Sequence, residues 1–269
     1  MKSKVLHGVL LIGLFFGSFG CGLSSWDKLT ITGTVAIQQR RYADAEKSFS
    51  AALEEAEKFG PEDTRLVQSL NNLAMVFAAQ GKYGEAEPMY KRAVAIREKA
   101  LGPDHPDVAA SLNSLAWLYG AQGKYGQAEP LYKRGLAIRE KVVGPEHPDV
   151  AASLDSLALL FAAQGKYTQA EPLYKRALAI REKARRADHP DVAQSLNYLA
   201  ALYYLQGKYA KAEPLYKRAL AIREKALGPE HPNVATSLEG YADLLRKTKR
   251  IAEAERLAAR AKAIRAKQK

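Results

Sequence analysis

Four histidines recur at a constant interval of 42 residues, each followed by proline and then by aspartate or asparagine: His105, His147, His189 and His231. An imidazole beside a carboxylate can bind a metal ion or act as a general base. Zinc needs its ligands about 2 Å from one centre, whereas equivalent positions in stacked helical units lie about 8–10 Å or more apart. The four histidines therefore cannot share a metal ion.

Other signatures of chemistry are missing from the sequence. None of the four histidines recurs with a serine or cysteine nucleophile in a strained turn, and no GxxxxGK[ST] or strand-linked GxGxxG motif is present. One set of glutamates stands beside each "YKR", a spacing that favours solvated ion pairs over a facing catalytic pair: Glu87, Glu129, Glu171 and Glu213. We therefore predict a protein that is not an enzyme and that needs no cofactor or metal.

The HPDV and HPNV tetrapeptides instead have the composition of a helix start. Proline suits the first position of a helix, where its missing amide hydrogen would be unpaired in any case. Aspartate in the first turn is favoured by the helix dipole, and histidine is a plausible hydrogen-bonding residue beside the cap. We therefore expect a helix to begin at each of Pro106, Pro148, Pro190 and Pro232.

The sequence between these helix starts, "SLxxLAxLYxAQGKYxxAEPLYKRALAIREK", indicates two helices per 42-residue unit. Leu112, Leu115, Ala116 and Tyr119 have the i, i+3, i+4, i+7 spacing of one helical face. Gly123 can take the left-handed conformation that ends a helix, and a second apolar face follows it. No stretch alternates with a period of two, so the expected fold class is all-α.

These residues resemble the tetratricopeptide repeats, most closely the 42-residue variety of kinesin light chains and many bacterial proteins. The small-and-large code of that family is present in the third unit at Leu112, Leu115, Ala116, Tyr119, Gly123, Tyr125, Ala128, Tyr132 and Gly135, and in the fourth at Leu154, Leu157, Ala158, Phe161, Gly165, Tyr167, Ala170, Tyr174 and Ala177. The resemblance implies a right-handed α-solenoid of six antiparallel helix pairs. The expected units are 28–64, 65–106, 107–148, 149–190, 191–232 and 233–269, and the last serves as a polar cap.

The resemblance also implies a concave groove formed by the first helix of each pair. Its predicted wall carries an amide or carboxylate once per unit beside apolar residues: Asn71, Met75, Asn113, Trp117, Asp155, Leu159, Asn197, Ala201 and Tyr204. Asparagine can donate to and accept from a peptide backbone, and large aromatic residues are typical of binding hot spots. We expect a protein or peptide partner in this groove, although Trp117 could instead pack against a neighbouring helix.

The N-terminal segment has the parts of an export signal. Two lysines precede an apolar run from Val5 to Gly20, which at 16 residues is shorter than the roughly 20 that span a membrane. Cys21, the only cysteine, follows this run, as in bacterial lipoprotein signals, although Ser18 and Phe19 depart from that pattern. The resemblance implies that residues 1–20 are a signal peptide cleaved before a lipidated Cys21, and that 21–27 form a linker.

Such a chain would be an exported lipoprotein anchored to the outer membrane or the periplasmic face of a membrane. Gly22, rather than aspartate, would by the same resemblance allow sorting to the outer membrane. The alternatives are an ordinary secretory signal, which would give a secreted or periplasmic protein, and an uncleaved N-terminal anchor.

Positive charge is concentrated in the last 24 residues. The whole chain has a formal net charge of +12, of which residues 246–269 supply +8. This basic tail could contact anionic lipid, nucleic acid or an acidic protein, with its candidate contacts at Arg256, Arg260, Lys262 and Arg265, or it could be a solvated cap. Nucleic acid is the weaker candidate because no aromatic residue follows Tyr241 to stack on bases.

These observations favour an exported scaffold that binds a protein segment in its groove near a membrane. A second hypothesis is a structural protein that self-assembles by end-to-end stacking of its repeats, hence a homo-oligomer. A third, a basic cytosolic adaptor that contacts nucleic acid, requires that the segment before Cys21 is never cleaved.

Overall fold

The computed structural model describes residues 22–185 and 187–267, and within these ranges the secondary structure is entirely helical. Residues 1–21, which include the predicted signal and Cys21, lie outside the described residues. The helices are α1 (Ser25–Gln38), α2 (Tyr42–Glu57), α3 (Thr64–Ala79), α4 (Tyr83–Leu101), α5 (Pro106–Ala121), α6 (Tyr125–Val143), α7 (Pro148–Ala163), α8 (Tyr167–Ala184), α9 (Pro190–Leu205), α10 (Tyr209–Leu227), α11 (Pro232–Lys247) and α12 (Ile251–Ala266).

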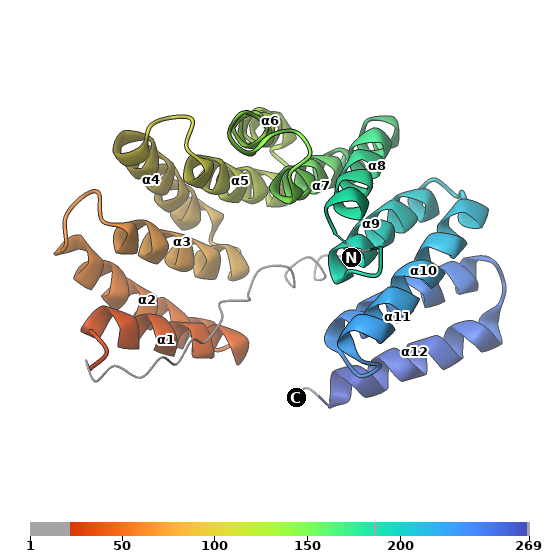
Figure 1. Cartoon of the computed structure of the whole chain (residues 1–269). Coiled ribbons are helices and arrows are strands. Elements are labelled where there is room, and N and C mark those ends of the chain that lie inside the picture. Colours follow the sequence, from red (N-terminus) through yellow and green to blue (C-terminus); the bar gives the residue numbers. More distant parts are fainter. Residues whose placement is uncertain (1–21, 186, 268–269) are drawn as a thin grey trace.

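The twelve described helices form six pairs that stack into an open arc (Figure 1). The two helices of each pair pack against each other, and the second helix of one pair packs against the first helix of the next. The first helices, α3, α5, α7 and α9, line the inner side of the arc, and the second helices α4, α6 and α8 lie outside them (Figure 1). The expected all-α solenoid of six helix pairs is confirmed.

Each HPDV or HPNV tetrapeptide caps a first helix. The Nδ1 atom of His105 accepts a hydrogen bond from the backbone N–H of Asp107 at 3.1 Å, and His147 does the same with Asp149 at 3.2 Å. The histidine is itself the N-cap residue, and the following proline opens the helix. An imidazole nitrogen thus does the work usually done by a serine or aspartate oxygen, as the sequence predicts for a helix start.

A left-handed residue ends each first helix. Gly123 has a φ of +74°, and the next amide, that of Lys124, donates to the carbonyl of Tyr119 at 2.8 Å. Glycine takes this conformation without steric cost. In the terminal units Arg40 and Lys249 hold the same conformation at φ +58° and +62°, which is less favourable for residues with a Cβ atom.

The solenoid begins earlier than the repeat pattern predicts. Helix α1 starts at Ser25, inside the expected linker 21–27, and Ser24 and Asp27 form a reciprocal capping box. Trp26 is buried and its Nε1–H donates to the hydroxyl of Ser69 at 2.8 Å. The sequence of the first unit differs strongly from the other repeats. Its first helix therefore begins where the capping box and the buried Trp26 place it, and the repeat pattern does not predict that position.

The core lies between the helices, and alanines alternate in it with large side chains. Ala116, Ala158 and Ala200 are fully buried at equivalent positions, which lets the backbones of paired helices approach closely. Leu154 of α7 is fully buried among Val150, Ala151 and Ile180. Within residues 22–185 and 187–267, no helix combines the length and apolar character needed to cross a membrane.

Candidate binding face

The predicted groove residues sit on α3, α5, α7 and α9, and we call the side of the arc that these helices line the inner face (Figure 1). Leu159 of α7 is 44% exposed, whereas Met75 and Ala201 are half-buried. An exposed leucine in the middle of an array, flanked by apolar side chains from neighbouring helices, is available for contact with a partner.

The two large aromatic residues of this face are each partly engaged by the core. Trp117 and Tyr204 are half-buried and pack against the main core cluster. The ring of Tyr204 also lies 5.8 Å from that of Tyr209. Trp117 therefore packs within the protein, as the alternative interpretation proposed, and still keeps part of its surface accessible.

The asparagines of the inner face turn their side-chain oxygen atoms into the protein interior, away from solvent. The Oδ1 atoms of Asn71, Asn113 and Asn197 are buried and accept no hydrogen bond within the described residues. Asn197 donates through Nδ2 to the hydroxyl of Ser237 at 2.9 Å. Asn71 and Asn113 are half-buried, and we expect their Nδ2 groups to be the accessible part of each side chain.

Asp155 differs from the asparagines at the equivalent positions. It is only 7% exposed, and its Oδ2 atom accepts a hydrogen bond from Arg181 at 2.6 Å. The same guanidinium donates to the hydroxyl of Ser195. The carboxylate predicted for the groove wall is thus committed to an internal ion pair.

Burial raises the pKa of the Asp155 carboxyl to about 6, against the opposing attraction of Arg181. The folded state then binds this proton more tightly than the unfolded chain, whose ordinary value is 3.8. The favourable contribution is complete only below the ordinary pKa of 3.8 and is lost as the pH rises through about 6.

We expect the free energy of unfolding of the wild type, relative to that of Asp155→Asn, to fall by roughly 2 kcal/mol between pH 4 and pH 7.5. Urea titrations of both proteins at several pH values measure this difference. Subtracting the two free energies of unfolding at each pH cancels the contributions of the other titrating groups. A difference that stays constant across this range would contradict the assignment.

The partner of Asp155 belongs to a row of arginines that the sequence analysis missed. The row, here called the arginine row, recurs every 42 residues in the second helices: Arg97, Arg139, Arg181, Arg223 and Arg265. Four of its members donate to a serine hydroxyl on the next first helix, as Arg97 does to Ser111 at 2.7 Å. The constant arginine in "AIREK" is the signal that could have revealed it.

The glutamates beside "YKR" form the ion pairs predicted for them. Glu129 contacts Lys133 at 2.6 Å and Glu171 contacts Lys175 at 2.8 Å, each one helical turn along an exposed surface. Glu87 and Glu213 make the same i, i+4 contact. Exposed pairs of this kind contribute little to stability.

The basic tail is partly neutralised by carboxylates of the neighbouring helices α10 and α11. Arg260 pairs with Glu224, and Arg265 lies 3.4 Å from Glu239. Arg256 and Lys262 are exposed on α12. The four predicted contacts therefore comprise Arg260, which ties the last unit to α10 of the preceding unit, Arg265, which pairs with α11 within the last unit, and two residues that face solvent.

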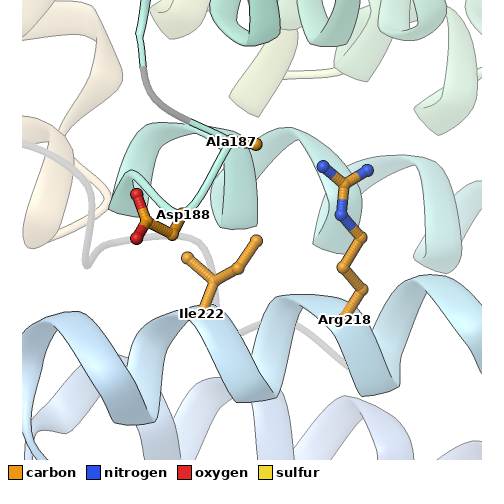
Figure 2. A pocket seen from close by; sticks show the side chains of 4 residues that line it. All are labelled: Ala187, Asp188, Arg218 and Ile222. Atoms are coloured by element: carbon orange, nitrogen blue, oxygen red, sulfur yellow. The ribbon is translucent and has the colours of Figure 1, made fainter.

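An open hollow of about 400 Å³ lies between α10 and the start of α9, lined by Ala187, Asp188, Arg218 and Ile222 (Figure 2). In three other units the arginine equivalent to Arg218 donates to the carbonyl of a linker proline. Ala187 stands where these linkers have their proline, and Arg218 pairs with Glu182 at 2.7 Å. The hollow marks this irregular linker, and it lies away from the inner face.

Stacked helix pairs of similar length, with small residues between the helices, define an α-solenoid built from helix-pair repeats. A family model described as tetratricopeptide repeat matches residues 32–99, 65–141, 132–183, 149–225 and 191–267. The chain therefore belongs to the tetratricopeptide repeat family.

The chain is similar to solved structures of kinesin-light-chain-like repeat proteins. BtubC (BKLC) from P. vanneervenii is 28% identical over 84% of this chain and 92% of that chain, with a TM-score of 0.70. A kinesin-light-chain-like protein of P. anserina with nearly identical repeats is 31% identical, over 78% of this chain and 98% of its own, with a TM-score of 0.62. The pilus biogenesis factor PilW shares the fold at 18% identity, over 90% and 94% of the two chains, and a TM-score of 0.59. No curated protein gives a significant sequence match.

Proposed function

We propose that this protein is a non-enzymatic scaffold whose inner face binds a segment of a partner protein. Tetratricopeptide repeats generally mediate contacts between proteins. The observation that carries the proposal is the sequence of accessible apolar side chains on successive first helices, in which Leu159 is 44% exposed and Met75 and Trp117 are half-buried. Apolar contacts of this kind, flanked by polar groups, are the usual basis of affinity for a peptide.

We also propose that Cys21 is lipidated and holds the inner face near a membrane, as part of an exported lipoprotein. Helix α1 begins at Ser25, only four residues after Cys21. A linker this short spans at most about 14 Å, so a lipid on Cys21 would keep the first unit at the membrane surface.

Self-assembly is a second candidate, favoured by one observation at the N-terminal end of the array. Leu23, Ile31 and Val35 are 56%, 49% and 40% exposed on and next to α1. A terminal helix with such an apolar outer surface can stack against another chain. Light scattering over a range of concentrations separates an assembling protein from a monomeric scaffold.

The double replacement Asn113→Ala and Trp117→Ala tests the binding proposal. We expect recovery of partner proteins with the tagged chain to fall at least about ten-fold, because the change removes an aromatic contact and an amide donor from the same unit. Lys133→Ala on the outer helix α6 is the control and should leave recovery unchanged. Undiminished recovery by the double variant, with normal helicity by circular dichroism, would refute the assignment of the inner face.

A further inference from the structure

One edge of the solenoid collects the starts of the first helices and the ends of the second helices, because the two helices of each pair are joined by a short turn and run antiparallel. Trp26 at the start of α1, Ala56 at the end of α2 and Leu66 at the start of α3 share one core cluster. The segments that join one pair to the next also cross this edge. We call its part in the first three units the linker edge, formed by residues 22–24, 58–63, 99–105 and 141–147.

Exposed apolar side chains are concentrated at the linker edge. Of the ten large apolar side chains that are exposed in the described part of the chain, five lie here, each 36% to 56% exposed: Leu23, Phe59, Leu101, Val142 and Val143. The opposite edge has two, Leu205 at the end of α9 and Ile251 at the start of α12, and these belong to different units. Such a concentration is typical of an interaction surface.

Ion pairs join the successive linkers of this edge. Lys99, near the end of α4, contacts Glu62 in the preceding linker at 3.2 Å, and Lys141, near the end of α6, contacts Asp104 at 2.5 Å. Each pair connects the end of a second helix to the linker of the unit before it, so the apolar residues of the three units form one series. The pairing also lowers the cost of bringing these carboxylates against a medium of low polarity.

A lysine stands one or two residues before an apolar residue in each of the three units: Lys58 and Phe59, Lys99 and Leu101, Lys141 and Val142. The three lysine side chains are 65%, 73% and 70% exposed. Lysine can keep its ammonium group among lipid headgroups while its methylene chain lies along an apolar surface. Apolar side chains accompanied by lysine are typical of protein surfaces that bind at the boundary between headgroups and acyl chains.

The apolar series ends after the third unit. Arg185 stands at the position equivalent to Leu101 and Val143, and its guanidinium lies 3.9 Å from Asp191. In the fifth unit Leu227 is half-buried. The pairs form an arc (Figure 1), and because each unit of a solenoid is rotated relative to the last, its edge can meet a flat surface over only a few units. The exposed apolar residues belong to the units nearest the N-terminus.

A bilayer fits this series better than a protein partner does. The apolar residues project from successive units, whose helices lie about 8–10 Å apart. A protein interface needs a closely packed apolar core, whereas lipid accepts separated side chains without a matching shape. The chain that precedes the solenoid also leaves from this edge: Leu23 is two residues from Cys21, and two residues span at most about 7 Å.

We propose that the linker edge lies on the lipid bilayer, with Phe59, Leu101 and Val142 at the boundary between headgroups and acyl chains. The contact turns a flexible tether into a fixed orientation, in which the helices of the first three units stand away from the membrane. The inner face then opens to the side, where a partner in the aqueous phase can reach it. The inference rests on the proposed lipidation of Cys21.

The test holds the chain on vesicles by a tether that does not depend on Cys21. Residues 22–269, which include the whole described solenoid, carry a histidine tag in place of residues 1–21 and bind phosphatidylcholine vesicles that contain a nickel-chelating lipid. The fluorophore NBD is attached through Val142→Cys at the linker edge or through Leu205→Cys at the opposite edge, in a chain with no other cysteine. We expect doxyl-labelled lipid to quench NBD by at least about half at position 142 and by less than about a tenth at position 205.

A second pair of variants tests the apolar side chains themselves. Leu101→Ser with Val143→Ser should lower the quenching at position 142 at least about three-fold, because it removes the neighbouring apolar contacts with lipid. Leu205→Ser with Ile251→Ser is the matched control, since it removes two equally exposed residues from the opposite edge, and it should leave the quenching unchanged. All four residues are exposed, and thermal melts show that both variants remain folded.

Quenching that is equal at positions 142 and 205, absent from both, or unchanged by the loss of Leu101 and Val143 would overturn the inference. So would NBD emission that rises with protein concentration and is not quenched by doxyl lipid, because it would mean contact between copies of the chain. The tag replaces the lipid, so these results are independent of the chemistry at Cys21. An unmodified Cys21 in the native chain would refute lipidation, whereas a lipidated native chain without quenching at position 142 refutes only the docking of the linker edge.

Discussion

Replacing Leu154 by alanine is expected to lower the free energy of unfolding by about 2–5 kcal/mol. Leu154 is fully buried in α7, at the centre of the array, among Val150, Ala151 and Ile180. The substitution leaves a cavity in an interior unit, and the packing of that unit couples the units on either side. The lost packing therefore lowers the cooperativity of unfolding of the whole solenoid. Urea denaturation followed by circular dichroism measures it.

The same helix supplies a matched control. Leu159 lies five residues further along α7 and is 44% exposed, so Leu159→Ala should change the free energy of unfolding by less than about 1 kcal/mol. Similar losses for the two leucines would mean that the inner and buried faces of α7 are not as described.

The second large effect is expected at Cys21. If this residue carries acyl chains, the wild-type protein enters the detergent phase when a detergent extract is warmed through its cloud point, because each buried methylene group contributes about 0.8 kcal/mol to partitioning. A chain in which residues 1–21 are replaced by an unrelated cleavable secretory signal should move to the aqueous phase almost completely. Mass spectrometry of the wild-type N-terminal peptide should show Cys21 as the first residue, with added acyl mass.

The substitution Cys21→Ala tests whether the acyl groups depend on this cysteine, since it should abolish the added mass. A wild-type N-terminus that is unmodified, or that still includes residues 1–20, would contradict lipidation and favour an ordinary signal or an uncleaved anchor.

The regular part of the fold could be predicted because its signals are local and repeated. Gly123 ends a helix because glycine readily takes the left-handed conformation, and His105 begins one because its imidazole accepts a hydrogen bond from the helix N-terminus. The structure shows both residues in the expected places. The start of α1 could not be predicted from the repeat, because Trp26 contacts Ser69, 43 residues away in the sequence.

The polar groups of the inner face were predicted less well than its helices. Helical phase places Asp155 and Asn113 at equivalent positions, but it does not show which long side chain from another helix reaches them. Arg181 reaches Asp155 from 26 residues away and removes its carboxylate from solvent. Exposure at such positions depends on neighbours such as Tyr198, which the repeat pattern leaves variable.

Site-specific photo-crosslinking tests most directly the claim that the inner face binds a protein segment. A photoreactive amino acid would replace Leu159, exposed on the inner helix α7, or Ala137, exposed on the outer helix α6. After irradiation in the native membrane, we expect a partner protein to be crosslinked from position 159 and not from position 137. Crosslinks of equal yield from both positions, or from position 137 alone, would contradict the account.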